Sequence, residues 1–87
     1  PKHWDKKWRI VIFDIPEGQR AYRDRFRRKL KSLGMYNFQR SSFAYPYECG
    51  PELELLSEYF RVTEYSTYLE ANHIDIDKQL KRYFKLK

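Results

Sequence analysis

The chain has 87 residues, of which 18 are Lys or Arg and 12 are Asp or Glu, so its net charge is +6. This length fits one domain, and no apolar run approaches the roughly 20 residues that a membrane span requires. A single Cys rules out an internal disulfide and fits a reducing cytoplasm, while one Cys and two His exclude a zinc finger.

The charge is distributed unevenly along the chain. Residues 1–47 carry 12 basic and 4 acidic side chains, residues 48–77 carry 1 and 8, and residues 78–87 carry 5 bases and no acid. A basic segment of this size favours a nucleic-acid or other acidic partner. Electrostatic self-association between the oppositely charged segments is the alternative.

The first predicted element is a strand from Trp8 to Phe13, because its aliphatic and aromatic run is typical of a strand buried on both faces. Asp14 marks the charged end of this strand. Pro16 stops it, since proline cannot donate a hydrogen bond to a ladder. Residues 1–6 are mostly polar and basic, and we expect them to form a linker or the tail of an upstream domain.

A helix is predicted next, from about Gln19 to Leu33, because Gly34 favours a stop after it. Its apolar residues recur every three or four positions and line one face: Tyr22, Phe26, Leu30 and Leu33. The other faces hold seven bases and one acid, Asp24. These bases either lie along nucleic-acid phosphates or form a solvated face that pairs with the acidic second half of the chain.

The remaining predicted elements are strands at residues 35–39, 42–47 and 65–71 and helices at residues 50–60 and 75–84. Pro51 suits the first turn of one helix, whose apolar stripe is Leu53, Leu56 and Phe60, and Asp75 suits the N-cap of the other. The order is β-α-β-β-α-β, which predicts an α+β, ferredoxin-like fold with two helices on one face of a four-stranded sheet and a short C-terminal helix. We expect the uncovered face to carry aromatic side chains and to meet a partner.

Two groups of side chains admit more than one interpretation. The aromatic residues of the predicted sheet either stack nucleic-acid bases or, as we expect, form a dimer interface or core: Phe38, Phe43, Tyr45, Tyr47, Tyr65 and Tyr68. Glu70, His73, Asp75 and Asp77 have the composition of a metal site, but capping and the first helical turn explain the two aspartates without a metal.

Several motifs together resemble a known family. The strand ending in Asp14-Ile15, the Arg-rich helix and Gln39-Arg40-Ser41-Ser42-Phe43 resemble the CRISPR-associated protein two family, the small ferredoxin-like subunit of spacer acquisition. Trp4-Asp5-Lys6-Lys7-Trp8-Arg9, with Phe13-Asp14-Ile15-Pro16-Glu17, is similar to the domain of this fold in PaaX-like transcriptional repressors, where a winged helix precedes it. Residues 7–73 would then be the Cas-two-like domain, and residues 74–87 a C-terminal helix and basic tail.

The resemblance implies a homodimer in which Asp14 lies near the two-fold axis and, with its symmetry mate, holds Mg²⁺ or Mn²⁺. The expected function is a cytoplasmic scaffold of spacer acquisition that binds DNA rather than RNA and the CRISPR integrase subunit, with weak metal-dependent endonuclease activity if Asp14 is catalytic. The alternative is the non-catalytic dimerisation core of a PaaX-like regulator fused to a winged-helix domain, with Asp14 as a turn residue. The expected nucleic-acid contacts are Arg20, Arg23, Arg27, Arg28, Lys31 and Arg40, and the expected dimer contacts are Phe43, Tyr45, Tyr47 and Tyr68.

Overall fold

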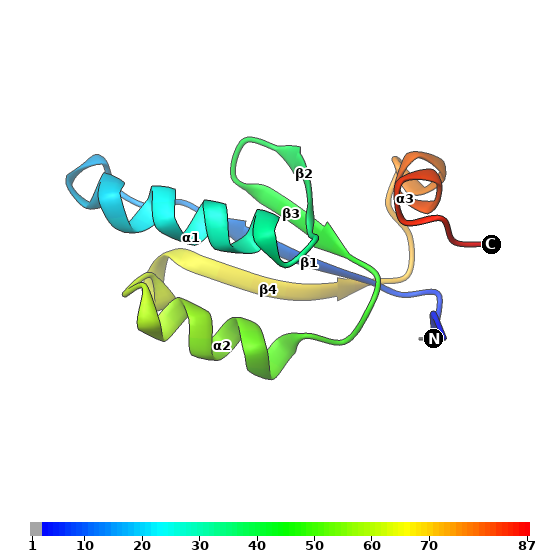
Figure 1. Ribbon diagram of the computed structural model, residues 1–87, viewed down its shortest axis with the longest axis horizontal. Coiled ribbons are helices and arrows are strands. Elements are labelled where there is room, and N and C mark those ends of the chain that lie inside the picture. Colours follow the sequence, from blue (N-terminus) through cyan, green and yellow to red (C-terminus); the bar gives the residue numbers. More distant parts are fainter. Residues whose placement is uncertain (1–2) are drawn as a thin grey trace.

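The computed structural model describes residues 3–87, so the first two residues of the predicted linker lie outside the described residues. The elements, labelled in Figure 1, are β1 (Trp8–Phe13), α1 (Arg20–Ser32), β2 (Tyr36–Gln39), β3 (Ser42–Tyr45), α2 (Gly50–Tyr59), β4 (Ser66–Ala71) and α3 (Asp77–Phe84). Short 3-10 turns at Glu17–Gln19 and Thr63–Tyr65 precede α1 and β4. This order confirms the predicted α+β ferredoxin-like fold.

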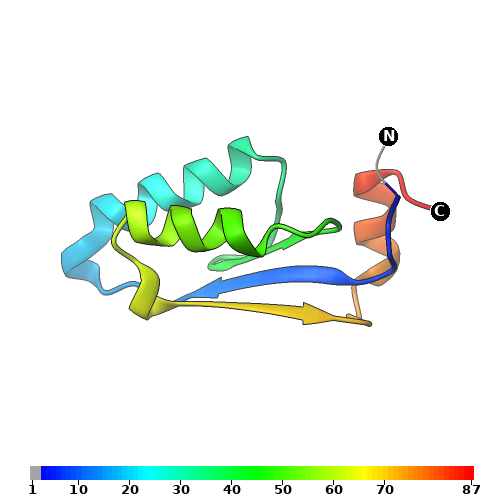
Figure 2. The ribbon, with the colours of Figure 1, turned by 90° about the horizontal axis from the view of Figure 1, so that it is seen from below.

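The four strands form one antiparallel sheet in the order β2-β3-β1-β4. The apolar strand β1 lies in the interior of the sheet, where Ile10 is the register partner of Ala44 in β3 and of Leu69 in β4. Helices α1 and α2 cover one face of the sheet, and α3 stands at one end, beside the described start of the chain and the C-terminus (Figure 2). No helix among residues 3–87 has the length and apolarity needed to cross a bilayer.

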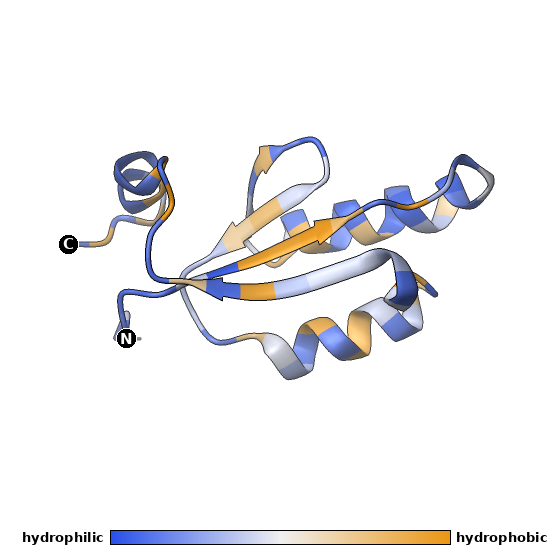
Figure 3. Ribbon diagram, turned by 180° about the vertical axis from the view of Figure 1, so that it is seen from behind, coloured by the Kyte–Doolittle hydropathy of each residue, from blue (hydrophilic) through white to orange (hydrophobic). Residues whose placement is uncertain are grey.

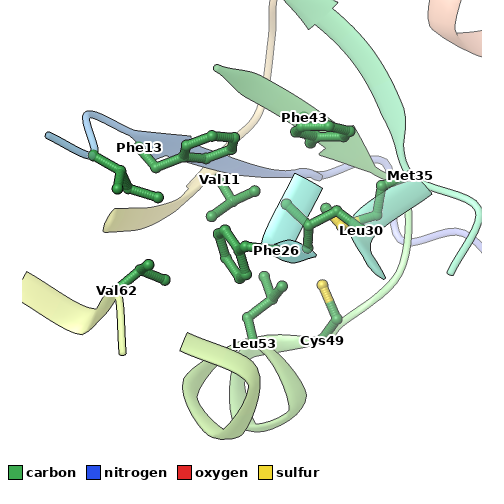
Figure 4. Packing of buried hydrophobic residues seen from close by; sticks show 10 residues of the cluster. Val11, Phe13, Phe26, Leu30, Met35, Phe43, Cys49, Leu53 and Val62 are labelled. Atoms are coloured by element: carbon green, nitrogen blue, oxygen red, sulfur yellow. The ribbon is translucent and has the colours of Figure 1, made fainter. Parts of the chain in front are cut away.

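The main core lies between the sheet and helices α1 and α2 (Figure 4). Val11 and Phe13 point from β1 towards α1, and the Phe13 ring meets the Phe26 ring edge to face, with centroids 5.4 Å apart. Leu53 of α2 and Val62 close the core from the other side. Burying side chains of this size contributes about 2 kcal/mol each, which is why the alternating residues of β1 fix the helix layer in place.

A second, smaller core lies on the opposite face of the sheet and is made by Trp8, Ile10, Ala44 and Leu80. Leu80 comes from α3, so the C-terminal helix covers one end of this face. The Trp8 Nε1 donates a hydrogen bond to the Asp77 carboxylate at 2.7 Å, which joins the start of β1 to the first turn of α3. Figure 3 looks onto this face and shows the apolar band along β1 with α3 to one side.

Two details of the predicted helices are wrong. Leu33 is 44% exposed and does not extend the buried face of α1, because the helix ends at Ser32 and the chain turns at Gly34, whose φ of 93° is a conformation that favours glycine. Asp75 is not the N-cap of α3, because Ile76 precedes the first helical residue and no side chain caps the helix.

Candidate functional site

Asp14 lies where the sequence places it, directly after β1. Its backbone N–H donates to the carbonyl oxygen of Tyr65 at 2.8 Å, and its side chain is exposed. Within residues 3–87 the carboxylate makes no hydrogen bond or ion pair, so it does not serve as the predicted acceptor of backbone N–H groups. This carboxylate is therefore free to meet a partner or solvent.

A divalent metal ion does not fit Asp14 within one copy of the chain. Mg²⁺ prefers six oxygen ligands, usually with more than one carboxylate. The described residues 3–87 contain no group of three or more His, Cys, Asp or Glu side chains that could hold a metal. Glu70, His73, Asp75 and Asp77, which have the composition of such a site, do not form one either. A metal at Asp14 would need carboxylates from a second molecule.

The six bases predicted to contact nucleic acid occupy three different environments. Arg28, Lys31 and Arg40 are exposed and form no ion pair within the described chain. Arg20 is also exposed but lies 3.1 Å from the Glu17 carboxylate. The Arg23 side chain is 19% exposed and pairs with Glu17 and Asp24, and the Arg27 guanidinium lies 6.0 Å from the centre of the Phe13 ring.

Helix α1 carries two further bases, Arg25 and Lys29, which the sequence did not single out. Both are exposed and line a shallow surface hollow with Phe60, at the end of α2. They lie one turn apart, so they share the flank of α1 that faces α2. Their helical spacing from the buried Phe26 was the signal that could have identified this flank.

The bases of α1 do not pair with the acidic second half of the chain. Within residues 3–87, their carboxylate partners are Glu17 and Asp24, which both belong to the first half. Helix α2 carries Glu52, Glu54 and Glu58 on the same side of the sheet, yet it forms no ion pair with α1 in the described chain. A basic and an acidic surface therefore lie next to each other without neutralising one another.

Phe43 cannot contact a dimer partner, and this prediction is wrong. Its side chain is 0% exposed, and its register partner in β1 is Val11, so it points into the main core under α1 and α2. Tyr68 is also a register partner of Val11 and lies on the same covered face, where its hydroxyl donates to Glu48 at 3.4 Å. Tyr45 packs against this core too, and its ring meets that of Tyr47 edge to face, with centroids 5.7 Å apart.

The exposed apolar residues of the sheet lie on its other face. Ile12 of β1 is 43% exposed, Leu69 of β4 is 37% exposed, and Phe38 of β2 is half-buried at the edge of the second core. We call these three side chains and Thr67, the register partner of Ile12, the open sheet face. Figure 3 shows no helix in front of this part of the sheet.

A buried charge lies at the start of β1. Arg9 is 4% exposed and forms a two-pronged ion pair with Asp5, at 2.8 and 2.7 Å, as well as bonds to Glu70 and to the carbonyl oxygen of Pro46. The bond from Arg9 holds the pKa of Asp5 well below its usual range. The described part of the predicted linker is thus attached to the sheet, while the boundary at residue 7 stays a prediction.

The comparison with known families agrees with this geometry. A family model described as the PaaX protein central Cas2-like domain matches residues 1–82. No curated protein and no solved structure matches the chain significantly. The match confirms the resemblance that the opening motif and the β-α-β-β-α-β order indicated.

Proposed function

This chain belongs to the family of PaaX central Cas2-like domains, and on that premise we propose that it is the dimerisation core of a transcriptional regulator and catalyses no reaction itself. The observation that carries this proposal is the open sheet face. Ile12 and Leu69 expose apolar surface on the face that helices α1 and α2 leave free. Leu69 is a diagonal neighbour of Ile12, because it lies two residues after Thr67, the register partner of Ile12. The two side chains therefore place exposed apolar surface side by side, where a partner could cover it.

A second copy of the chain is the partner that this face fits. A two-fold axis lets one apolar surface meet itself, and most soluble oligomers are dimers of this symmetry. Small domains bury too little surface to be very stable alone, so a dimer that covers Ile12 and Leu69 would also stabilise each fold.

Sedimentation analysis of single-site variants tests the dimer. We expect the unchanged chain to sediment as a dimer and Ile12→Glu to sediment as a folded monomer, because a carboxylate in the interface would lose its hydration. Leu55→Glu is the matched control, since Leu55 is 68% exposed on α2, away from this face. A dimer that survives Ile12→Glu but dissociates in Leu55→Glu would place the interface on the helix layer and contradict the proposal.

We also propose that the domain contacts the DNA backbone without reading its sequence. The bases of α1 support this function, because several of them are exposed and have no carboxylate partner within the described chain. Arginine and lysine side chains in such number bind phosphates and make affinity steeply dependent on salt. Recognition of a particular operator sequence would then belong to a fused winged-helix domain.

Binding to duplexes of unrelated sequence tests the DNA contact. We expect similar affinities for each duplex and a weakening of binding as salt rises. Binding that depends on sequence, or that does not respond to salt, would contradict a backbone contact.

Spacer acquisition and metal-dependent cleavage are the other functions that the family resemblance raises. Both would require partners that one copy of this chain does not supply: an integrase subunit in the first case and a second carboxylate beside Asp14 in the second. We expect no cleavage of DNA or RNA with Mg²⁺ or Mn²⁺, by either the unchanged chain or Asp14→Asn. Cleavage that disappears in Asp14→Asn would show that the domain is a nuclease with a metal site shared between two copies.

A further inference from the structure

The flank of α1 that faces α2 has the composition of an anion site. One shallow hollow at the surface is lined by Arg25, Arg28, Lys29 and Ser32 of α1 and by Phe60, the residue directly after α2. Arg28 and Lys29 are close to Arg25 in space because they follow it by three and four residues on one helix. The half-buried Phe60 ring lies against Phe26, with centroids 6.1 Å apart, and so fixes one wall of the hollow.

None of these three bases is neutralised within the described chain. Arg20 and Arg23, nearer the beginning of α1, both pair with Glu17, and Arg23 also lies beside Asp24. Arg25, Arg28 and Lys29 have no carboxylate within ion-pair distance among residues 3–87. Their positive charge is therefore available to a ligand.

Arg61 adds a fourth base from a different part of the sequence. It is the single base among residues 48–77, and it directly follows Phe60. Its guanidinium lies 6.0 Å from the centre of the Tyr22 ring, and Tyr22 is the neighbour of Arg25 one turn along α1. The fold thus brings the one base of the acidic segment to the basic helix.

Arg61 has a backbone conformation that is uncommon for residues other than glycine. Its φ is 58°, in the left-handed region, and the Val62 N–H bonds back to the Ser57 carbonyl oxygen at 2.8 Å, which is the usual end of a helix at a glycine. Glycine would adopt this conformation at lower cost. Lys6 and Lys85 adopt the same left-handed region, so the conformation alone assigns Arg61 no role, but it means that Arg61→Gly removes the guanidinium without straining the backbone.

We propose that Arg25, Arg28, Lys29 and Arg61 form a phosphate-binding site for the backbone of a nucleic-acid duplex. This inference rests on the proposed DNA contact and locates it on the α2-facing flank of α1. The hollow is open and has no deep cavity to enclose a small ligand, so it fits phosphates presented on the surface of a duplex. Forked guanidinium groups suit this geometry because they bind phosphate oxygens in pairs.

Fluorescence anisotropy with a labelled duplex of about 20 base pairs, measured over a series of salt concentrations, tests the site. We expect Arg25→Ala/Lys29→Ala to weaken binding about tenfold at low salt and to lower the slope of log K against log salt by about two, since each lost phosphate contact removes about one. The matched control is Lys78→Ala/Arg82→Ala, which removes the same charge at the same spacing from α3 and should leave the slope almost unchanged.

Arg61→Gly separates binding from folding. This variant removes the guanidinium but relieves the left-handed backbone, so we expect unchanged or increased thermal stability together with roughly fivefold weaker binding at low salt. Arg61→Lys should restore part of the affinity, because it restores the charge without the fork. Binding by Arg61→Gly that equals that of the unchanged chain would remove Arg61 from the site.

Three other outcomes would overturn the inference in different ways. A large loss in Arg20→Ala/Lys31→Ala with none in Arg25→Ala/Lys29→Ala would keep the DNA contact and move it to the other flank of α1. No binding by the unchanged chain would contradict the DNA contact itself. Salt-sensitive self-association without DNA binding would show that these bases meet the acidic α2 of a second copy.

Discussion

Arg9 is the residue whose environment departs most from its sequence context. It lies in a strand whose other residues are apolar, and it is almost fully buried beside Asp5, Glu70 and the carbonyl oxygen of Pro46. A buried charge is tolerated when it is paired and its donors are satisfied, and no buried side-chain nitrogen or oxygen in the described chain lacks a partner. The strand position of Arg9 could be read from the sequence, but its partners come from residues up to 61 positions away.

The two sides of this ion pair should respond differently to mutation. Asp5 and Glu70 keep 48% and 36% of their side chains exposed, so water can replace Arg9 when it is removed. Removing both acids instead leaves a buried guanidinium without a counter-charge, which is the more costly change. We expect Asp5→Asn/Glu70→Gln to lower the urea midpoint more than Arg9→Met does. The reverse ranking would mean that Arg9 is stabilised mainly by its bonds to backbone carbonyls.

Acid should weaken the fold through Asp5 and Asp77. The bond from Arg9 lowers the pKa of Asp5, and the bond from the Trp8 indole lowers the pKa of Asp77. Because the folded pKa lies below the unfolded value of about 4, each carboxylate stabilises the fold above that pH and loses this contribution as pH falls through the folded pKa.

Urea unfolding over a series of pH values checks this effect. We expect the stability difference between the unchanged chain and Asp77→Asn to be largest above about pH 5 and to shrink below about pH 4. The asparagine can still accept the Trp8 N–H, so the pH-dependent part of the difference reports the charge. A difference that stays constant with pH would contradict this linkage.

At the scale of elements, hydrophobic periodicity predicted the helices and strands. The sheet face on which each aromatic side chain lies could not be predicted in this way, because it depends on how the strands pair. Phe43 is one of three successive aromatic positions at alternate residues, and from the sequence alone either sheet face is possible. The register shows that Phe43 is paired with Val11, and paired residues point to the same face, so Phe43 lies on the face that the helices cover. The position of Arg61 beside Tyr22 of α1 was not predictable either, since it depends on how the end of α2 meets α1.

Helix α3 illustrates the same limit, because its sequence predicts a helix but not where the helix docks. Leu80 is fully buried against the Trp8 side of the sheet and is the main apolar anchor of α3. We expect Leu80→Ala to destabilise the fold by about 3 kcal/mol, which corresponds to a fall in melting temperature of roughly 15 °C for a domain of this length. Leu55→Ala, at an exposed position of α2, should change stability by less than about 0.5 kcal/mol. If calorimetry shows that Leu80→Ala lowers the stability as little as Leu55→Ala does, α3 contributes little to the folded core.

The molecule has two main layers, the sheet and the pair of helices α1 and α2, and the open sheet face lies on the side of the sheet away from these helices (Figure 2). The sequence indicated the parts of this arrangement one by one: an apolar strand, a basic helix and an acidic segment. A symmetric dimer could in principle present both basic helices to one duplex. The layer order does not favour that arrangement, because two copies joined through their open faces would carry their α1 helices on opposite outer surfaces.

The proposed dimer should therefore bind DNA through each copy separately. We expect the monomeric variant Ile12→Glu to retain the salt slope of the unchanged chain and to bind each duplex with similar affinity per chain, since no phosphate contact is shared across the two-fold axis. Anisotropy titrations at equal chain concentration, with the oligomeric state followed by sedimentation, check this expectation. If Ile12→Glu instead halves the slope, one duplex contacts both copies, and the dimer must bring the two α1 helices to the same side. That result would require an interface that includes Ile12 but extends over β4 to the edge of the sheet, so that the helix layers of two copies could lie side by side.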